Sequence, residues 1–161
     1  MKTIRIPTCV ASFVIAIVLL LQISPALAGG SPNVELTYTK WVTIAPGYPL
    51  MEGVVGGDVV GTFAGTVLQL KPIANGKITY VEALYVVIAG PHTFTADIQG
   101  NENDTKGFVG ATNTLAGTII DGWLTGAEVY VHYESFLCAE PNALDGLCYT
   151  GTIRIMTGSA H

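Results

Sequence analysis

Residues 121–156 read DGWLTGAEVYVHYESFLC, then AEPNALDGL, then CYTGTIRIM, and this stretch decides the fold. The Asp121-Gly122 pair is a turn signal. The residues that follow are rich in β-branched and aromatic types, which is typical of a strand. Cys138 ends that segment and Cys148 begins the next. The pattern predicts a β-hairpin whose loop end is closed by a disulfide between the two cysteines.

The rest of the chain carries more segments of the same kind and no sustained 3.6-residue period. Strand-like segments alternate with turn-rich ones, and the strands are expected at 34–45, 54–70, 78–89, 92–99, 107–120, 123–137 and 148–156. Loops are expected at 46–53, 71–77 and 100–106. The succession predicts an all-β fold, a single antiparallel β-barrel of about eight strands. A β-sandwich also fits, but a closed barrel hides the edge strands of so apolar a meander.

The first 28 residues have the layout of a secretory signal. Lys2 and Arg5 precede an uncharged apolar run, and Ala26-Leu27-Ala28 is a small-x-small cleavage site. The run is too short for a spanning helix, which needs about 20 residues. We therefore expect a signal peptide at 1–28, a β-barrel domain at 29–161, and no stable membrane anchor. The protein is expected to be secreted, or periplasmic in a Gram-negative host, where a cysteine pair forms a disulfide.

Charge and motifs exclude several classes of function. All twelve acidic residues but only five of the seven basic ones lie after residue 28, so the mature chain has a net charge of −7. Such a surface does not suit nucleic acid or anionic lipid. The sequence has no Gly-x-Ser-x-Gly elbow, no His-Glu-x-x-His and no phosphate-binding loop. It predicts no metal site and no cofactor.

Glu82 is the sharpest single candidate. In an extended strand it shares a face with Ile78, Tyr80, Leu84 and Val86, and a carboxylate on an apolar face is costly to bury unless it is partnered or protonated. If that face lines the barrel, Glu82 is a candidate general acid or base and Tyr80 a ligand-binding residue. The opposite face of 78–89 is just as apolar, so Glu82 pointing outward is the alternative.

The strand at 123–137 offers a second group. Glu128, Tyr130 and His132 share one face, with His132 as a candidate base and the other two as ligand-binding residues. The favoured interpretation is a solvated outer face, because the opposite face looks more like core. Asp58 follows two glycines and is a further ligand-binding candidate, with a structural role in a turn or bulge as its alternative.

Three patches resemble the allene oxide cyclase barrel-like superfamily, which includes plant dirigent-type proteins. They are Gly57–Gly65, Val81–Tyr85 and Gly117–Gly126. The resemblance implies an eight-stranded barrel that encloses an apolar small molecule and often forms trimers. Members either cyclise a reactive lipid epoxide or steer the coupling of phenolic radicals. The polar residues expected near the cyclase's first strand have no clear match in 34–45.

Two function hypotheses follow. The first is a barrel that encloses a small apolar or aromatic molecule and binds it, or guides its cyclisation or coupling without a cofactor. The second is a structural or interaction module that forms homo-oligomers, such as a trimer, and has a solidly packed interior. A hydrolase is a weaker third, since no nucleophile constellation is visible.

Overall fold

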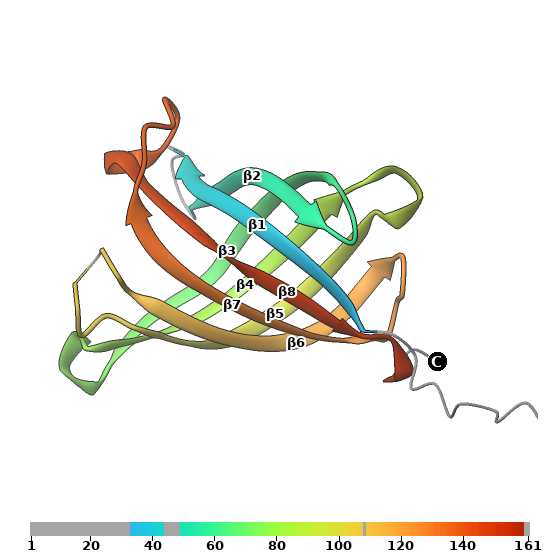
Figure 1. The fold of residues 1–161 in the computed structure, drawn as a ribbon. Coiled ribbons are helices and arrows are strands. Elements are labelled where there is room, and N and C mark those ends of the chain that lie inside the picture. Colours follow the sequence, from blue (N-terminus) through green and yellow to red (C-terminus); the bar gives the residue numbers. More distant parts are fainter. Residues whose placement is uncertain (1–32, 44–48, 108, 160–161) are drawn as a thin grey trace, which may run out of the picture. The chain divides into compact units, whose positions relative to one another are not determined.

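The computed structural model describes residues 33–43, 49–107 and 109–159, and within them eight strands close into a barrel (Figure 1). Each strand pairs antiparallel with the next, and β1 closes the sheet against β8. The strands are β1 (Val34–Thr43), β2 (Leu50–Gly57), β3 (Gly61–Ile73), β4 (Ile78–Ile88), β5 (Phe94–Asn103), β6 (Thr112–Gly122), β7 (Glu128–Leu137) and β8 (Leu147–Met156). The predicted all-β barrel is confirmed. The expected signal peptide lies outside the described residues.

Several predicted boundaries were wrong. The expected loop at 46–53 is partly strand, because β2 begins at Leu50, and the strands expected at 107–120 and 123–137 begin later, at Thr112 and Glu128. The segment 54–70 is not one interrupted strand, because the chain turns at residues 58–60 between β2 and β3. Gly57 has φ of +90°, a conformation that glycine adopts readily. The expected loop at 100–106 is also partly strand, since β5 runs to Asn103 and pairs with both β4 and β6.

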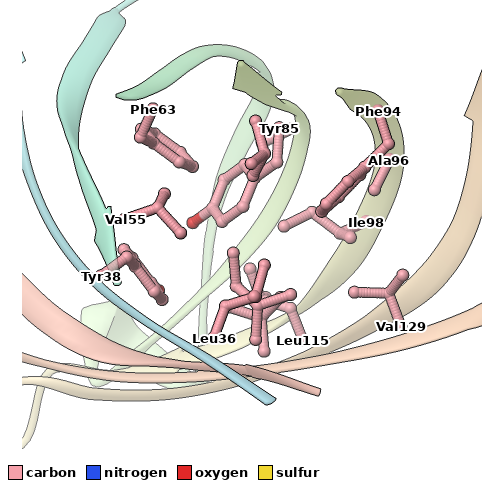
Figure 2. Close-up of a cluster of buried hydrophobic side chains, with 14 of the residues drawn as sticks. Leu36, Tyr38, Val55, Phe63, Tyr85, Phe94, Ala96, Ile98, Leu115 and Val129 are labelled. Atoms are coloured by element: carbon pink, nitrogen blue, oxygen red, sulfur yellow. The ribbon is translucent and has the colours of Figure 1, made fainter. Parts of the chain in front are cut away.

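Alternation along each strand separates the inside of the barrel from its outside. From Val81 to Val87 in β4 the odd-numbered side chains are buried and the even-numbered ones are not. Figure 2 shows side chains from strands around the barrel converging on its axis, among them Tyr85, Phe94 and Leu115. These three are each 1% exposed or less, so they belong to the buried core.

Inward-facing glycines let the sheet coil tightly enough to close. A Cβ on Gly117 would lie 1.8 Å from the carbonyl oxygen of Asp97 on β5. A Cβ on Gly151 would lie 1.9 Å from the carbonyl oxygen of His132 on β7. No side chain fits in either place, which explains glycine within a strand.

The two ends of the barrel differ. We call "disulfide end" the end with the β3–β4, β5–β6 and β7–β8 connections, which lies on the left in Figure 1. There Cys138 and Cys148 form a disulfide, with Cα atoms 5.8 Å apart, as the sequence predicted. The other end, where β1 begins and β8 ends, is the "terminal end". Within the described ranges no helix has the length and apolar character needed to span a bilayer.

Candidate functional site

Glu82 lies on the outer face of β4, so the interpretation that it lines the barrel interior is wrong. The buried face is the other one, with Val81, Ala83 and Tyr85 inside. Glu82 is half-buried beside Asp97 and Gln99 in a shallow outer hollow. Its neighbour in the prediction, Tyr80, also points outward and donates a hydrogen bond of 2.7 Å to Gln99 Oε1. Both faces of 78–89 are apolar, so the sequence alone did not show which face of this strand lines the barrel.

The outward group on β7 lies where the favoured interpretation put it. Glu128, Tyr130 and His132 are exposed, and the Tyr130 hydroxyl donates to Glu128 Oε2 at 3.2 Å. His132 Nδ1 lies 2.6 Å from the carbonyl oxygen of Asn113. Because a carbonyl only accepts, Nδ1 carries the proton in this contact. The interpretation of these residues as a polar cluster inside the barrel is therefore wrong.

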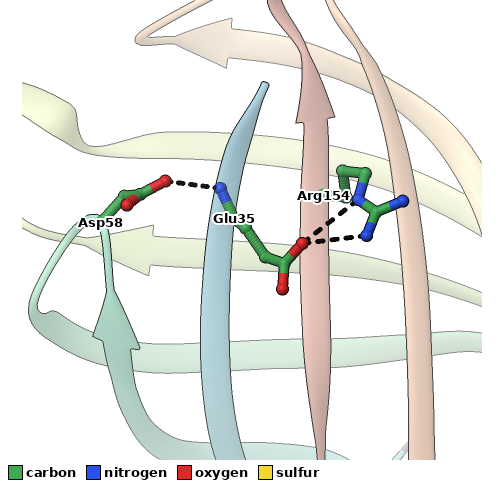
Figure 3. A network of polar contacts seen from close by, with 3 residues as sticks. All are labelled: Glu35, Asp58 and Arg154. Carbon is green, nitrogen blue, oxygen red and sulfur yellow. Dashed lines mark hydrogen bonds and ion pairs between the residues drawn. The ribbon is translucent and has the colours of Figure 1, made fainter. Parts of the chain in front are cut away.

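Asp58 closes the β2–β3 turn against the start of β1. Its Oδ2 accepts a hydrogen bond of 2.8 Å from the Glu35 backbone N–H (Figure 3). The Asp58 N–H also donates to the Glu35 carbonyl at 3.1 Å. Glu35 in turn forms an exposed ion pair of 2.9 Å with Arg154 on β8. The structure thus gives Asp58 the structural role in a turn that was its alternative.

The polar groups that the structure does bring together inside the barrel are different residues. Lys40 is only 3% exposed, because β1 directs its even-numbered side chains inward. Its Nζ donates a hydrogen bond to the Tyr85 hydroxyl and contacts Met51 Sδ at 3.4 Å. The ion pair that the described residues form joins Arg154 and Glu35. No carboxylate among these residues lies within salt-bridge distance of the Lys40 amine.

Aromatic rings surround the amine. The ring centroids of Tyr133 and Tyr85 lie 4.3 and 4.5 Å from Lys40 Nζ, and that of Tyr149 lies 5.3 Å away. The rings of Tyr38 and Phe63 follow at 5.9 and 6.0 Å. The faces of such rings attract a cation within about 6 Å. These rings stabilise the charge of an ammonium group far less than water does, so the amine remains poorly solvated.

Burial lowers the pKa of Lys40 from 10.5 to about 7, and the charge of Glu102 opposes the shift. The cause is the loss of hydration, which penalises the charged form. Burial also raises the pKa of the tyrosines nearby, Tyr38, Tyr85, Tyr133 and Tyr149. Near neutral pH the site therefore holds neutral phenols around an amine that is neutral in about half of the molecules.

A carboxyl group and a short hydrogen-bond chain lie beside the amine. Asn113 Nδ2 donates to the Tyr133 hydroxyl at 3.1 Å, and that hydroxyl donates to Glu102 Oε2 at 2.6 Å. Burial raises the pKa of Glu102, the hydrogen bond from Tyr133 opposes the rise, and the nearby Asp104 adds to it. Asp104 itself accepts a hydrogen bond of 2.8 Å from Thr79.

These groups line a cavity of about 230 Å³ in the disulfide-end half of the barrel. Its polar lining includes Lys40, Glu102 and Asp104, and its apolar lining includes Val67, Val81 and Ala83. A second, more apolar hollow of about 300 Å³ shares Val42 and Tyr149 with it and is otherwise lined by residues such as Leu137, Leu144 and Leu147. The terminal-end half is packed instead with side chains such as Leu36, Ile119 and Ile155.

Two buried polar atoms near this cluster have no hydrogen-bond partner among the described residues, the Tyr38 hydroxyl and Asn113 Oδ1. Buried polar groups are nearly always hydrogen-bonded to protein or to water. Unpartnered ones mark a place where a polar group of another molecule is favoured. Within the described ranges, no three His, Cys, Asp or Glu side chains are grouped so that they could hold a metal ion.

Sequence reasoning missed this site, although one signal was available. Along 34–43, Leu36, Tyr38, Lys40 and Val42 share a face, and Lys40 is the one charged group on it. The argument that singled out Glu82 applies to Lys40 as well, and here the opposite face is polar. Glu102 gave no such signal, because it lies in the polar run GNENDTK.

Comparison with protein-family models, with curated proteins and with solved structures finds no match to this chain.

Proposed function

We propose that the barrel binds a small apolar or aromatic molecule in the cavity beside Lys40, either as a carrier or to guide its cofactor-free cyclisation or coupling. The observation that carries the proposal is the uneven filling of the interior. One half is solid with aliphatic and aromatic side chains, and the other keeps a cavity of about 230 Å³ lined by rings and a few polar groups. Small-molecule sites typically combine apolar walls with few, well-placed polar groups.

The volume limits the ligand. An apolar cavity of about 150 Å³ is large enough to take up benzene. The cavity of about 230 Å³ therefore suits a single ring with a short substituent, or an aliphatic molecule of similar bulk. A longer apolar tail has room in the neighbouring hollow, which shares Val42 and Tyr149 with the cavity.

The polar groups favour a neutral ligand that carries a hydrogen-bonding oxygen. The lining holds two carboxyl residues, Glu102 and Asp104, against a single basic residue, Lys40. An anionic ligand would face the carboxyl groups, whereas a hydroxyl or carbonyl oxygen can accept from the Lys40 amine or from the Tyr85 hydroxyl, both of which line the cavity. Such contacts fix the orientation of a bound molecule, which is how a cofactor-free site directs a reaction.

The superfamily resemblance forms part of this proposal. Residues 57–65, 81–85 and 117–126 carry it, and an eight-stranded barrel is the architecture that it implies. If it holds, a cyclase-like or dirigent-like activity is the chemistry to test first. The residues around the cavity are then Lys40, Glu102 and the tyrosines, and not Glu82 or His132.

Secretion is also part of the proposal. The disulfide between Cys138 and Cys148 is compatible with an oxidising compartment, and residues 1–28 have the composition of a signal. N-terminal sequencing of protein secreted by its own host should begin at Gly29. A protein retained in the cytoplasm with Met1 intact would oppose this part of the proposal.

Calorimetry of the purified barrel with benzyl alcohol and phenol tests the binding. Ala83 lines the cavity, so Ala83→Leu should fill it and weaken binding at least about tenfold, which is about 1.4 kcal/mol. Ala116→Leu is the matched control, because Ala116 is exposed on the outer face of β6. Equal affinities in the two variants, or no binding of any single-ring compound by the unmodified protein, would contradict the proposal. Native mass spectrometry of protein from its own host would then identify the natural ligand.

A homo-oligomer is the second candidate, favoured by two exposed aliphatic side chains that lie on either side of Thr62 on the outer face. Val54 pairs with Thr62, and Thr62 pairs with Ile88. Val54 and Ile88 are 53% and 51% exposed. Light scattering of the unmodified protein and of Val54→Glu tests this candidate. A monomer in both would remove it, and a trimer that dissociates in the variant would support it.

A further inference from the structure

Lys40 is an unusual residue to find inside this barrel. Lys40 is buried inside the barrel, whereas the other lysines among the described residues, Lys71, Lys77 and Lys106, are exposed to solvent. Its amine has a phenol and a thioether as hydrogen-bond partners and no carboxylate within salt-bridge distance among the described side chains. A buried charge without a counter-ion is destabilising, so the fold itself gains little from a lysine here.

The same surroundings make the amine reactive. Burial lowers the pKa of Lys40 to about 7, so that a large fraction is neutral under ordinary conditions. The neutral amine is the nucleophile, and lysines activated by desolvation form Schiff bases with carbonyl compounds. The amine lies on a cavity with room for a ring-sized molecule, which supplies the second requirement, access for the carbonyl group.

We propose that Lys40 forms a reversible imine with the aldehyde or ketone group of a small neutral molecule held in the barrel cavity. The proposal rests on the function proposed above, since the carbonyl compound must first bind there. It assigns a covalent attachment point and narrows the ligand class to apolar or aromatic carbonyl compounds. Oxo acids are disfavoured as ligands, because their carboxylate would lie beside the carboxyl groups of Glu102 and Asp104. The basic group of the cavity lining is Lys40 itself, and its amine is used in forming the imine.

The step balances without a cofactor. The lone pair of neutral Nζ attacks the carbonyl carbon, and a proton moves from nitrogen to oxygen to give a carbinolamine. The C–O bond then breaks, the oxygen leaves as water with a proton from a nearby acid, and a protonated imine remains. Loss of the imine proton returns that acid to its starting form. The net change is amine plus carbonyl to imine plus water.

Groups for each part of the step surround the amine. Nζ donates to the Tyr85 hydroxyl, which leaves the phenol proton free to reach the carbinolamine oxygen. Glu102, whose Oε2 accepts a hydrogen bond from the Tyr133 hydroxyl, lies on the same cavity and can relay a proton to or from the reacting atoms. The faces of Tyr133 and Tyr85, with centroids 4.3 and 4.5 Å from Nζ, stabilise the positive charge of the protonated imine.

Reductive trapping tests the proposal. The full mature barrel is incubated with benzaldehyde and sodium cyanoborohydride at about pH 7, and the modified lysine is located by peptide mapping. An exposed lysine is neutral in only about one molecule in a few thousand at this pH. Lys40 should therefore be benzylated at least about tenfold faster than Lys71, Lys77 or Lys106. In Lys40→Met this fast addition should disappear, and in the control Lys71→Met it should persist.

Benzyl alcohol, which has the same ring and no carbonyl, separates the two proposals. It should bind the cavity reversibly and slow the trapping of benzaldehyde. Binding of benzyl alcohol with no preferential modification of Lys40 would overturn the imine and leave the binding function intact. Failure of both compounds to bind would overturn both. The site preference is read in the unmodified protein, so the result does not depend on the Lys40→Met variant folding.

Discussion

Replacing Lys40 by methionine should flatten the pH dependence of folding stability between about pH 7 and pH 9. In the unfolded chain Lys40 takes up a proton with an ordinary pKa of 10.5, but in the folded barrel burial lowers this pKa to about 7. Between these values the unfolded state binds more protons than the folded state, so the free energy of unfolding rises with pH. The loss of folding stability that burial of Lys40 causes is complete at pH values below its pKa in the folded state. It disappears at pH values above its pKa in the unfolded state.

The magnitude follows from the size of the shift. Each pH unit in this window contributes about 1.4 kcal/mol when one proton separates the two states. About half of the folded molecules are protonated at pH 7, which reduces the gain over two pH units to about 2 kcal/mol. The wild-type protein should gain this amount relative to Lys40→Met, which carries no titrating group at the position.

Denaturant unfolding of both proteins at several pH values in this range measures the effect. The titratable groups that face Lys40 from β1, β4, β5, β7 and β8 are Tyr38, Tyr85, Glu102, Tyr133 and Tyr149. Burial raises the pKa of these tyrosines, so stability falls again at higher pH as the phenols of the unfolded chain ionise. The comparison is therefore confined to pH values below their ordinary range.

Lys71→Met provides the control, because Lys71 is exposed at the end of β3. It should follow the wild-type curve. Parallel curves for wild type and Lys40→Met would refute the reasoning, since they would mean that burial leaves the proton affinity of this amine unchanged. A higher stability of Lys40→Met at pH 7 is expected on the same grounds, because a thioether is cheaper to bury than an amine.

Three further changes test other parts of the structure. Replacing Cys138 and Cys148 by serine should lower the free energy of unfolding by about 3 kcal/mol in denaturant titrations, because the cross-link restricts the unfolded chain. Gly117→Ala should destabilise the barrel by roughly 1–3 kcal/mol in the same assay, since its Cβ would overlap the Asp97 carbonyl. Glu82→Gln should leave calorimetric affinity for benzyl alcohol unchanged, because Glu82 lies outside the barrel.

Each of these has an outcome that would count against it. Equal stability of oxidised and cysteine-free protein would show that the disulfide does not restrict the unfolded state. Gly158→Ala, with open space around its Cβ, is the matched control for Gly117→Ala, and equal losses in the two would remove the steric explanation. A marked loss of affinity in Glu82→Gln would contradict the assignment of the odd-numbered face of β4 to the cavity.

The fold could be predicted from the sequence because the strand signals are local. β-Branched residues, aromatic residues and turn pairs mark β4 and β8 to within one residue at each end. They also place β7, although it begins five residues later than expected, and the paired cysteines identify the last hairpin. The β2–β3 turn at 58–60 was missed, since its glycines resemble those inside strands. What distinguishes Gly57 is a positive φ and a hydrogen bond from Asp58 to Glu35, a residue distant in sequence.

The site could be predicted only in part, because it depends on which face of each strand turns inward. For β4 both faces are apolar, so Glu82 and Tyr85 were equally plausible as lumenal residues from sequence alone. For β1 the faces differ, and Lys40 stands out among Leu36, Tyr38 and Val42. Glu102 becomes part of the site only through the register of the sheet, because Glu102 on β5 and Tyr133 on β7 both pair with Asn113 on β6.

The unequal filling of the barrel means that the side chains at the terminal end serve the fold alone, whereas those around the cavity serve both the fold and recognition. Side chains at the terminal end, such as Leu36, Ile119 and Ile155, can hold the architecture while substitutions around the cavity alter what it accepts. A library restricted to Val67, Val81 and Ala83, which line the cavity and are also part of the core, would sample new ligands while leaving the packing of the terminal end unchanged. The same separation would allow descendants of one ancestral barrel to diverge in chemistry while keeping a common shape.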